Sequence, residues 1–111
     1  MLTKKNSIFK IELLALKALY GKDCYGYEIC TTIKECTGGL FDIKLGVMYP
    51  ILYQLMEQHY ISSYEEIYNG RARVYYHLED QGREHYKELY AEYLEKFHVI
   101  NQFLEGTNVD G

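Results

Sequence analysis

The dipeptide Asn69-Gly70 stands between two runs of strand-forming residues, and it constrains the fold more than any other feature of this sequence. Both residues readily adopt positive φ, so Asn-Gly between two such runs predicts a tight β-hairpin. We expect its strands at residues 61–68 and 72–78. Arg71 and Arg73 follow the turn two residues apart, which places both side chains on one face of the second strand.

A helix over residues 44–58 is predicted immediately before the hairpin. Met48, Leu52 and Leu55 mark its core face, because steps of four and three place side chains on one side of a helix. Pro50 is the only proline of the chain, and its ring presses on the carbonyl four residues earlier. That carbonyl belongs to a glycine, which gives the backbone room to adjust. We therefore expect a short first turn or a slight kink instead of a break.

The opposite strip of this helix is rich in aromatic and small side chains and remains free for a contact outside the core. It consists of Lys44, Val47, Tyr49, Pro50, Tyr53 and Gln54. A helix that leads into a hairpin with arginines near its tip is the pattern of a winged helix-turn-helix.

The first helix is expected to begin at a cap provided by Asn6 or Ser7 and to run to Tyr20, with Gly21 as its stop. It is apolar on nearly every side, and such a helix is buried from more than one direction. A domain this small offers limited cover, so a partner subunit should shield part of this helix.

A second helix is expected over residues 25–36, with Asp23 as its N-cap, and forms the first half of the helix-turn-helix. Its core residues should be Tyr27, Ile29 and Ile33. Two interpretations of Tyr25 remain open: its hydroxyl contacts a phosphate near the positive end of the helix, or its ring only packs.

The last helix should span residues 80–104, a length of roughly 38 Å. Apolar residues recur along it at steps of three and four, and a single winged domain cannot cover a stripe of that length. Self-association is therefore favoured over a helix folded back on its own domain. The expected dimer contacts are Phe9, Leu13, Tyr86, Leu89, Tyr90, Tyr93, Phe97, Ile100 and Phe103. Residues 106–111 should be disordered.

Three segments combine these elements with specific motifs: LLALKALYGKDCYGYEICTTIKECTGGLF, GVMYPILYQLMEQHYISSYEE and NGRARVYYHLEDQGRE. In order and spacing they resemble the PadR family of bacterial transcriptional regulators, over roughly residues 8–104. The resemblance is to the short branch of the family, with one long C-terminal helix and no separate second domain. It implies a mainly α fold with a small β-hairpin, in which a winged helix-turn-helix over residues 1–79 precedes a dimerisation helix over residues 80–105.

The resemblance also implies a homodimeric DNA-binding transcriptional regulator, most often a repressor. Its recognition helix would enter the major groove at each half of a palindromic operator, and the wing arginines would hold the flanking backbone or minor groove. Lys44 and the tyrosine hydroxyls would hold phosphates, and Gln54 would read an adenine edge. The expected DNA contacts are Tyr25, Lys44, Val47, Tyr49, Pro50, Ile51, Tyr53, Gln54, Arg71 and Arg73.

Several positions depart from the family pattern. Tyr53 and Gln54 stand where members often carry Arg or Lys, and this removes phosphate contacts. Glu79 replaces the usual threonine before the last helix, so Asp80 is expected to cap that helix in its place. His59 replaces the usual glycine at the end of the recognition helix, and histidine tolerates the left-handed conformation better than most residues.

A multidrug-sensing branch of the family sandwiches planar aromatic drugs between tryptophans of the last helices at the dimer centre. This chain has no tryptophan, and Tyr93 stands at the matching position. Tyr93, together with Phe9, either stacks on a planar aromatic small-molecule effector or only closes the interface. An effector that binds there would change the spacing of the two recognition helices and release the DNA.

The net charge of −4 counts against a DNA-binding protein, but its distribution softens the objection. Residues 1–79 carry nine basic and nine acidic side chains, whereas residues 80–111 carry three and seven. A modest positive face is therefore expected, with weak non-specific DNA affinity that falls with salt. Its members are Lys4, Lys5, Lys44, Arg71 and Arg73.

Sequence motifs for catalysis and metal binding are missing. No Gly-rich phosphate loop, H-E-x-x-H pair or G-x-S-x-G elbow occurs, so we expect no enzyme and no cofactor. The four histidines show no zinc-ligand spacing, and the three cysteines, six residues apart, are expected to be reduced thiols. Without a signal peptide or a membrane-spanning run, the protein is expected to be cytoplasmic.

Two other functions fit parts of the sequence. The thirteen tyrosines are compatible with stacking on single-stranded nucleic acid, but most of them lie on stripes assigned to the core or the dimer. A winged-helix module for protein interaction or dimerisation would suit the electrically neutral first 79 residues. DNA binding that depends on Arg71 and Arg73 would separate a regulator from such a module.

Overall fold

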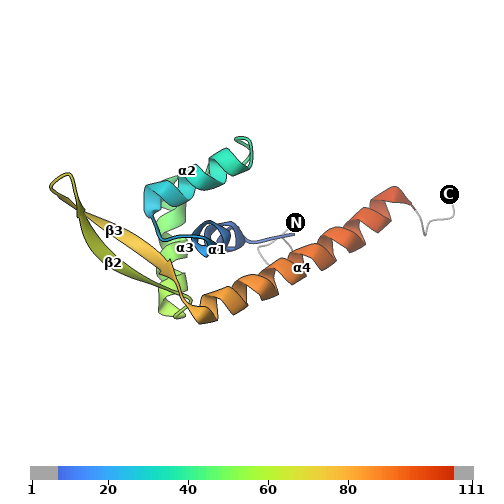
Figure 1. Ribbon diagram of the computed structural model, residues 1–111. Helices are drawn as coiled ribbons and strands as arrows, with labels where there is room; N and C mark the ends of the chain where they lie inside the picture. The colour runs from blue at the N-terminus through green and yellow to red at the C-terminus, as the bar shows by residue number, and fades with distance from the viewer. Residues whose placement is uncertain (1–7, 107–111) are drawn as a thin grey trace.

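Three helices form the centre of the molecule, and a hairpin and a long helix leave it in opposite directions (Figure 1). The computed structural model describes residues 8–106. Its elements are α1 (Ile11–Tyr20), β1 (Cys24–Tyr25), α2 (Gly26–Cys36), α3 (Leu45–Glu57), β2 (Ile61–Tyr68), β3 (Arg71–Leu78) and α4 (Asp80–Glu105). This confirms the mainly α winged helix-turn-helix with a C-terminal helix that the sequence predicts.

The hairpin predicted from Asn69-Gly70 is confirmed, and we call it the wing. Asn69 has a φ of 51° and Gly70 a φ of 79°, the left-handed values that this two-residue turn requires. Strand β2 pairs with β3 in antiparallel register, and β3 begins at Arg71, one residue earlier than expected. The sequence did not reveal the two-residue strand β1, which pairs with the other edge of β3 and gives the sheet order β1-β3-β2.

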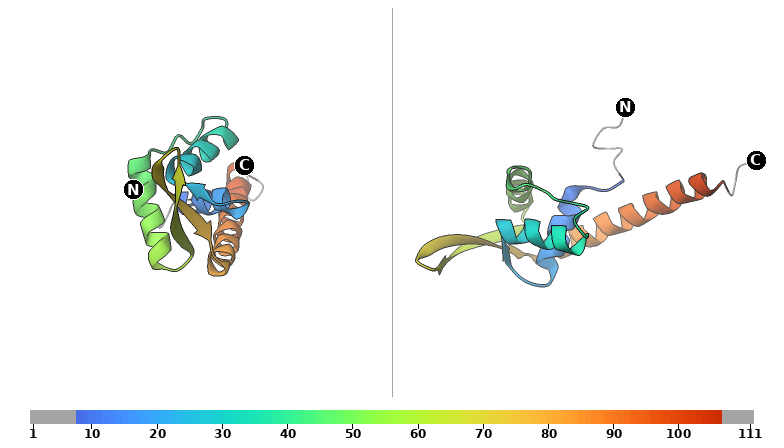
Figure 2. Two further views of the ribbon diagram at one scale, coloured as in Figure 1. Left: turned by 60° about the vertical axis from the view of Figure 1, so that its left-hand side comes forward. Right: turned by 90° about the horizontal axis from the view of Figure 1, so that it is seen from above.

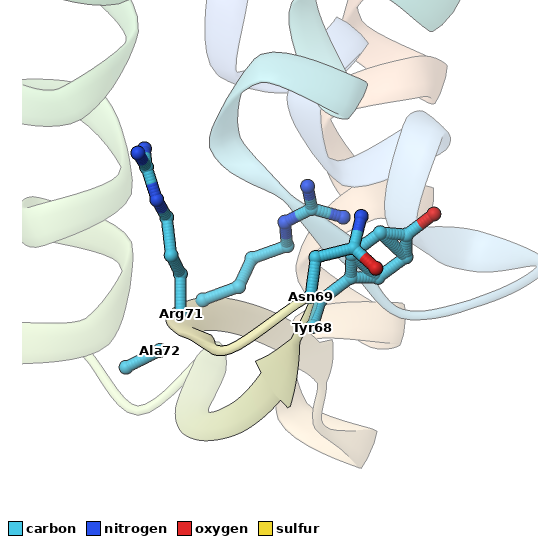
Figure 3. Close-up of a pocket in the computed structure, with 5 residues that line it drawn as sticks. Tyr68, Asn69, Arg71 and Ala72 are labelled. Carbon is cyan, nitrogen blue, oxygen red and sulfur yellow. The ribbon is translucent and has the colours of Figure 1, made fainter.

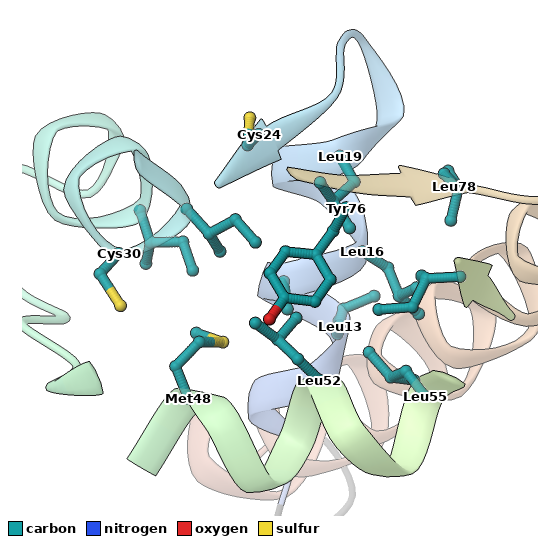
Figure 4. Close-up of a cluster of buried hydrophobic side chains, with 14 of the residues drawn as sticks. Leu13, Leu16, Leu19, Cys24, Cys30, Met48, Leu52, Leu55, Tyr76 and Leu78 are labelled. Atoms are coloured by element: carbon teal, nitrogen blue, oxygen red, sulfur yellow. The ribbon is translucent and has the colours of Figure 1, made fainter. Parts of the chain in front are cut away.

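Helix α3 turns its predicted face into the core, where Met48, Leu52 and Leu55 are at most 1% exposed. The same cluster of buried side chains contains Leu13, Leu16, Leu19, Cys24, Ile29, Ile33, Tyr76 and Leu78 (Figure 4). Ile29 and Ile33 are thus confirmed as core residues of α2, but Tyr27 is wrong, because it is 63% exposed. Two helical steps of about 100° place Tyr27 on the side of α2 opposite Ile29, and the buried Cys30 takes the core position.

Two helix starts differ from their predictions. Helix α1 begins later than expected, after Lys10, because residues 8 and 9 form a bend; Asn6 and Ser7, the expected caps, lie outside the described residues. Its end at Gly21 is confirmed. Asp23 does not cap α2, because the N-cap position lies two residues further on and the Asp23 carboxylate has other hydrogen-bond partners.

Both ends of α3 agree with the sequence. Two successive backbone amides donate to the Lys44 carbonyl at 3.0 Å, which makes a short first turn, and the helix continues unbroken through Pro50. At the other end His59 has a φ of 65°, which confirms the left-handed conformation expected there. The next amide donates back to the Leu55 carbonyl at 3.0 Å and closes the helix.

Only Glu79 separates β3 from α4, and hydrogen bonds hold this junction from two sides. The Glu79 backbone amide donates to the Tyr60 carbonyl at 3.0 Å, and Ser62 Oγ donates to the Glu79 carboxylate at 2.6 Å. Glu79 is the N-cap residue without a side-chain cap, and Asp80 is already helical. The prediction that Asp80 caps this helix is therefore wrong.

Helix α4 approaches the α3–β2 connection closely, and Gly82 makes this approach possible. A Cβ at Gly82 would collide with the carbonyl oxygen of Tyr60 and would lie 2.7 Å from Leu78 Cδ1. The helix is 26 residues long and ends at Gly106, whose φ is 70°; the rest of the tail expected to be disordered lies outside the described residues. Over residues 8–106, even this helix lacks the apolar run that a membrane-spanning segment requires.

The three cysteines are free thiols in different surroundings. Burial raises the pKa of Cys24 to about 11 and also raises the pKa of Cys30. Cys36, the last residue of α2, is exposed. The thiolate is the reactive form of cysteine, so the raised pKa and the burial of Cys24 and Cys30 make both unreactive. Cys36 is the one cysteine of the three with an accessible sulfur.

We expect a thiol-specific reagent such as Ellman's to react rapidly with one cysteine of the native protein and with all three after denaturation. The Cys36→Ser variant should lose this rapid reaction, and its two remaining cysteines should react only after denaturation. A rapid phase that survives in this variant would show that Cys24 or Cys30 is accessible and would contradict the buried positions described above.

Candidate nucleic-acid interface

The strip predicted on α3 is confirmed as a solvent-exposed surface, and Figure 2 shows α3 on the outside of the molecule. Its exposed side chains are Lys44, Val47, Tyr49, Pro50, Tyr53 and Gln54. Ile51 is an exception, because it lies three residues after Met48 and packs against the core. Ile51 therefore offers less of its side chain to DNA than expected, whereas the other six side chains are exposed to solvent.

Tyr49 also sets the distance between the two helices of the helix-turn-helix. A Cβ at Gly26, the first residue of α2, would lie 2.9 Å from Tyr49 Cε1 and 3.1 Å from its hydroxyl oxygen. The tyrosine ring thus lies directly against the backbone of Gly26. Part of the Tyr49 side chain, which was expected to face DNA, therefore packs on α2. The spacing of residues within α3 does not reveal this contact with another helix.

Acidic side chains moderate the positive charge beside this strip. Lys44 Nζ lies 3.1 Å from Asp42 Oδ2, and Lys34 Nζ lies 3.7 Å from the same oxygen. The hydrogen bond from Lys44 and the charges of both lysines lower the pKa of Asp42. In the sheet, Glu66 stands opposite Arg73. The face is therefore only modestly positive, and Lys4 and Lys5, its other expected members, lie outside the described residues.

The wing holds Arg73 between two tyrosine rings. Its guanidinium carbon lies 4.1 Å from the ring centre of Tyr25 and 4.2 Å from that of Tyr68. A hydrogen bond with Tyr75 raises the pKa of Arg73 further above its ordinary value. The ring of Tyr25 thus packs under an arginine, and the phosphate contact of its hydroxyl stays a prediction.

Arg71 projects from the tip of the wing and is exposed. It lines a hollow of about 510 Å³ together with Tyr68, Asn69, Ala72 and Arg73 (Figure 3). Within residues 8–106, no carboxylate lies within ion-pair distance of Arg71 or Arg73. Both guanidinium groups therefore keep their charge available to an external anion.

The predicted dimer residues divide between the core and the surface. Leu13 and Leu89 are each only 7% exposed and belong to the core of their own chain, because α1 packs directly on α4. Their assignment to a surface between subunits is corrected accordingly. Tyr86 and Tyr93 pack partly against the core, as does Phe9. Seven large apolar side chains of α4 remain exposed. Val99 lies two helical steps of about 100° from Phe97, on another side of the helix. The other six, here called the α4 stripe, are Tyr90, Leu94, Phe97, Ile100, Phe103 and Leu104.

The two residues expected to meet an effector lie side by side. The ring of Phe9 meets that of Tyr93 edge-on at a centroid distance of 6.1 Å, and it meets Phe41 in the same way at 5.4 Å. Phe41 comes from the α2–α3 connection. The sequence did not reveal it, because it lies outside any helix or strand whose pattern of apolar residues would indicate which way its side chain points. Tyr93 also stacks on Tyr90 and Phe97, at 6.4 and 6.1 Å.

His85 connects α4 to two other parts of the chain. Its Nε2 lies 3.3 Å from Glu12 Oε1 on α1, and its ring stacks on Tyr60 at 4.0 Å. These partners are remote in the sequence, so the scattered positions of the histidines did not reveal them. Among the described residues, no three His, Cys, Asp or Glu side chains are grouped as a metal site would require.

Comparison with protein families matches residues 15–88 to the family described as transcriptional regulator PadR-like. Two solved structures are similar over most of their length. A transcriptional regulator from Clostridium thermocellum is 32% identical with a TM-score of 0.79, over 84% of this chain and 91% of that one. A PadR family transcription regulator from Clostridium difficile is 34% identical with a TM-score of 0.74, over 85% of this chain and 97% of that one.

A third structure contains DNA. It is PadR of Bacillus subtilis in complex with operator DNA, which is 25% identical with a TM-score of 0.64. The similarity covers 71% of this chain and 46% of the Bacillus protein, so this chain matches less than half of that regulator.

Proposed function

This chain belongs to the PadR-like family of transcriptional regulators, and on that ground we propose that it binds a palindromic DNA operator as a homodimer. Members of the family are transcriptional regulators and not enzymes. In this proposal α3 enters the major groove of each half-site, and the wing holds the adjoining backbone. The complex of Bacillus subtilis PadR with operator DNA supports the proposal.

The observation that carries the proposal is the joint exposure of the α3 strip and the wing arginines. The strip offers the Gln54 amide for an adenine edge and apolar groups for thymine methyl groups. Arg71 and Arg73 share one face of β3 and have no carboxylate partner among the described residues. Base-reading groups on a helix and cations on the adjacent hairpin are the two kinds of contact that specific DNA binding combines.

The α4 stripe supports the proposed homodimer. Its six apolar side chains extend along a helix that leaves the rest of the chain, and within residues 8–106 each of them remains exposed (Figure 1). A second copy of α4 would bury both stripes across a two-fold axis. The same axis would place two α3 helices on one side of the duplex, which is why the operator is expected to be palindromic.

We further propose that the protein acts as a repressor and that a planar aromatic molecule releases it. Phe9, Phe41 and Tyr93 form an aromatic group where α4 meets the winged domain. A ligand that prefers one arrangement of this contact would change the separation of the two α3 helices and so weaken operator binding. By reciprocity, operator DNA must weaken ligand binding, and a ligand affinity that is unchanged by DNA would refute this mechanism.

The test of DNA binding uses the upstream region of the protein's own gene and the single variants Arg71→Ala and Arg73→Ala. Each phosphate contact contributes about 0.9 to the slope of log affinity against log salt. A dimer carries each arginine twice, so each variant should lower the slope by up to about 1.8 and weaken binding. Fluorescence anisotropy at several salt concentrations measures both quantities.

Lys87→Ala is the matched control, because it also removes one cation per chain, from an exposed position on α4 that pairs with Glu84. Its affinity and salt slope should stay close to those of the unaltered protein. If the unaltered protein binds no DNA in this measurement, the result would instead support the alternative function, a winged-helix module for protein interaction or dimerisation. The paired state of Lys44 with Asp42 favours that alternative.

A further inference from the structure

Asp23 lies in the connection between α1 and β1, and its carboxylate joins both strands of the wing to that connection. The Tyr64 hydroxyl of β2 donates to Asp23 Oδ2 at 2.7 Å. On the neighbouring strand, β3, His77 Nδ1 lies 2.9 Å from Asp23 Oδ1. One side chain thus bridges two strands that follow it by 41 and 54 residues.

From this bridge a continuous series of ring contacts leads along one face of the wing to Arg73. The rings of Tyr64 and Tyr75 stack at a centroid distance of 5.8 Å. Tyr75 meets Tyr25 edge-on at 5.6 Å, and Tyr25 lies under the Arg73 guanidinium at 4.1 Å. The strand register explains this alignment. Tyr64 stands directly opposite Tyr75, and Arg73 precedes Tyr75 by two residues on β3, so its side chain lies on the same face.

The protonation states fix the direction of the Tyr64–Asp23 hydrogen bond. Burial raises the pKa of Asp23, but the hydrogen bonds of Tyr64 and His77 outweigh it and leave the pKa below its ordinary value. The hydrogen bond to Asp23 raises the pKa of Tyr64 to about 12. At neutral pH the carboxylate therefore only accepts and the phenol donates, which makes this a charge-assisted hydrogen bond.

The core holds the base of the wing through Tyr76 and Leu78, but beyond this base few contacts fix the direction of the wing. After the first two residues of β2, every residue of that strand is exposed. Strand β1 pairs with only Tyr75 and Tyr76 of β3. A two-stranded hairpin is at best marginally stable in water, so the direction of its tip relative to α3 depends on contacts at its base.

We propose that Asp23 is a positioning residue for DNA binding, which anchors the wing through Tyr64 and His77 so that Arg73 is held ready for a phosphate. This inference rests on the proposed function. It assigns a role in affinity to a residue that lies outside both the α3 strip and the wing, and that touches no DNA itself.

The test is a double-mutant cycle of Tyr64→Phe and Arg73→Ala, measured by operator affinity. Tyr64→Phe removes the hydroxyl that Asp23 binds and keeps the ring that stacks on Tyr75. In the otherwise unaltered protein it should weaken binding by about threefold to tenfold. In the Arg73→Ala background its effect should be clearly smaller, because only Arg71 at the wing tip then still depends on the anchor. Asp23→Asn, which keeps one acceptor oxygen but removes the charge, should show the same coupling to Arg73.

Tyr20→Phe is the control, because it removes a tyrosine hydroxyl from the end of α1, outside the wing, the α3 strip and the α4 stripe, and keeps the ring that meets Tyr86. A second measurement needs no DNA: amide hydrogen exchange of residues 65–74 should accelerate in Tyr64→Phe, while the amides of Leu52 and Leu55 in α3 stay protected. A role limited to general stability would accelerate both groups alike.

Additive losses in the cycle, or an unchanged affinity in Tyr64→Phe, would overturn this inference while the proposed function stands. If the unaltered protein binds no DNA at all, the proposed function fails and this inference fails with it. The two failures are therefore distinguished by the affinity of the unaltered protein.

Discussion

The Gly82→Ala variant is expected to be less stable than the unaltered protein by about 3 kcal/mol, since the added methyl group has no space. It would collide with the carbonyl oxygen of Tyr60 and approach Leu78 Cδ1 to 2.7 Å. A backbone carbonyl cannot rotate away as a side chain would, and this one also accepts the hydrogen bond of the Glu79 amide. The collision should outweigh the gain of about 1 kcal/mol that alanine brings to a helix. Urea denaturation measures the difference.

Gly46→Ala provides the matched control. Gly46 is also helical, but a Cβ there would meet no atom within 4 Å. Its stability should therefore stay equal or rise, by up to about 1 kcal/mol. If both variants lose stability alike, the close contact between α4 and Tyr60 is not the cause. Equal stability of Gly82→Ala and the unaltered protein would show that α4 can shift away at little cost.

The double variant Phe97→Asp/Ile100→Asp is expected to sediment as a single subunit at micromolar concentration, whereas the unaltered protein is expected to sediment as a dimer. The two-fold axis repeats both substitutions, so four carboxylates would enter the interface without partners. This should weaken association by at least about 4 kcal/mol, or roughly a thousandfold. Operator affinity should fall in parallel, because a monomer engages one half-site only.

Ala91→Asp is the control for this experiment, because it adds a carboxylate on the polar side of the same helix, away from the α4 stripe. It should remain dimeric. Phe97 and Ile100 are exposed within one chain, so circular dichroism should show an intact fold for every variant. An unaltered protein that sediments as one subunit would contradict the dimer, as would a double variant with unchanged sedimentation.

The parts of the fold that could be predicted from the sequence are those set by neighbouring residues. The turn at Asn69-Gly70 depends on the φ values that two adjacent residues accept, and it occurs where predicted. The core face of α3 depends on spacing within a single helix, and its members are buried as predicted. The left-handed conformation of His59 was expected from the family resemblance, because His59 stands where the family usually has glycine.

Contacts between remote segments could not be predicted in this way. Asp23 fits the pattern of an N-cap residue, but its partners lie 41 and 54 residues away on the wing. No local pattern indicates that a two-residue strand will pair with β3 and bring Tyr25 beneath Arg73. The apolar period of α4 identified Tyr90, Phe97, Ile100 and Phe103 of its stripe and missed Leu94 and Leu104. Only the packing of α1 on α4 shows that Leu89 belongs to the core.

The single residue between β3 and α4 has a mechanical consequence. A connection of one residue, tied by its amide to Tyr60 and by its carboxylate to Ser62, has no slack in which a swing of α4 can be lost. We therefore expect a tilt of α4 at this junction to displace the base of β3 as well. Glu79 thus joins α4 directly to the wing, so the orientations of the two elements depend on each other.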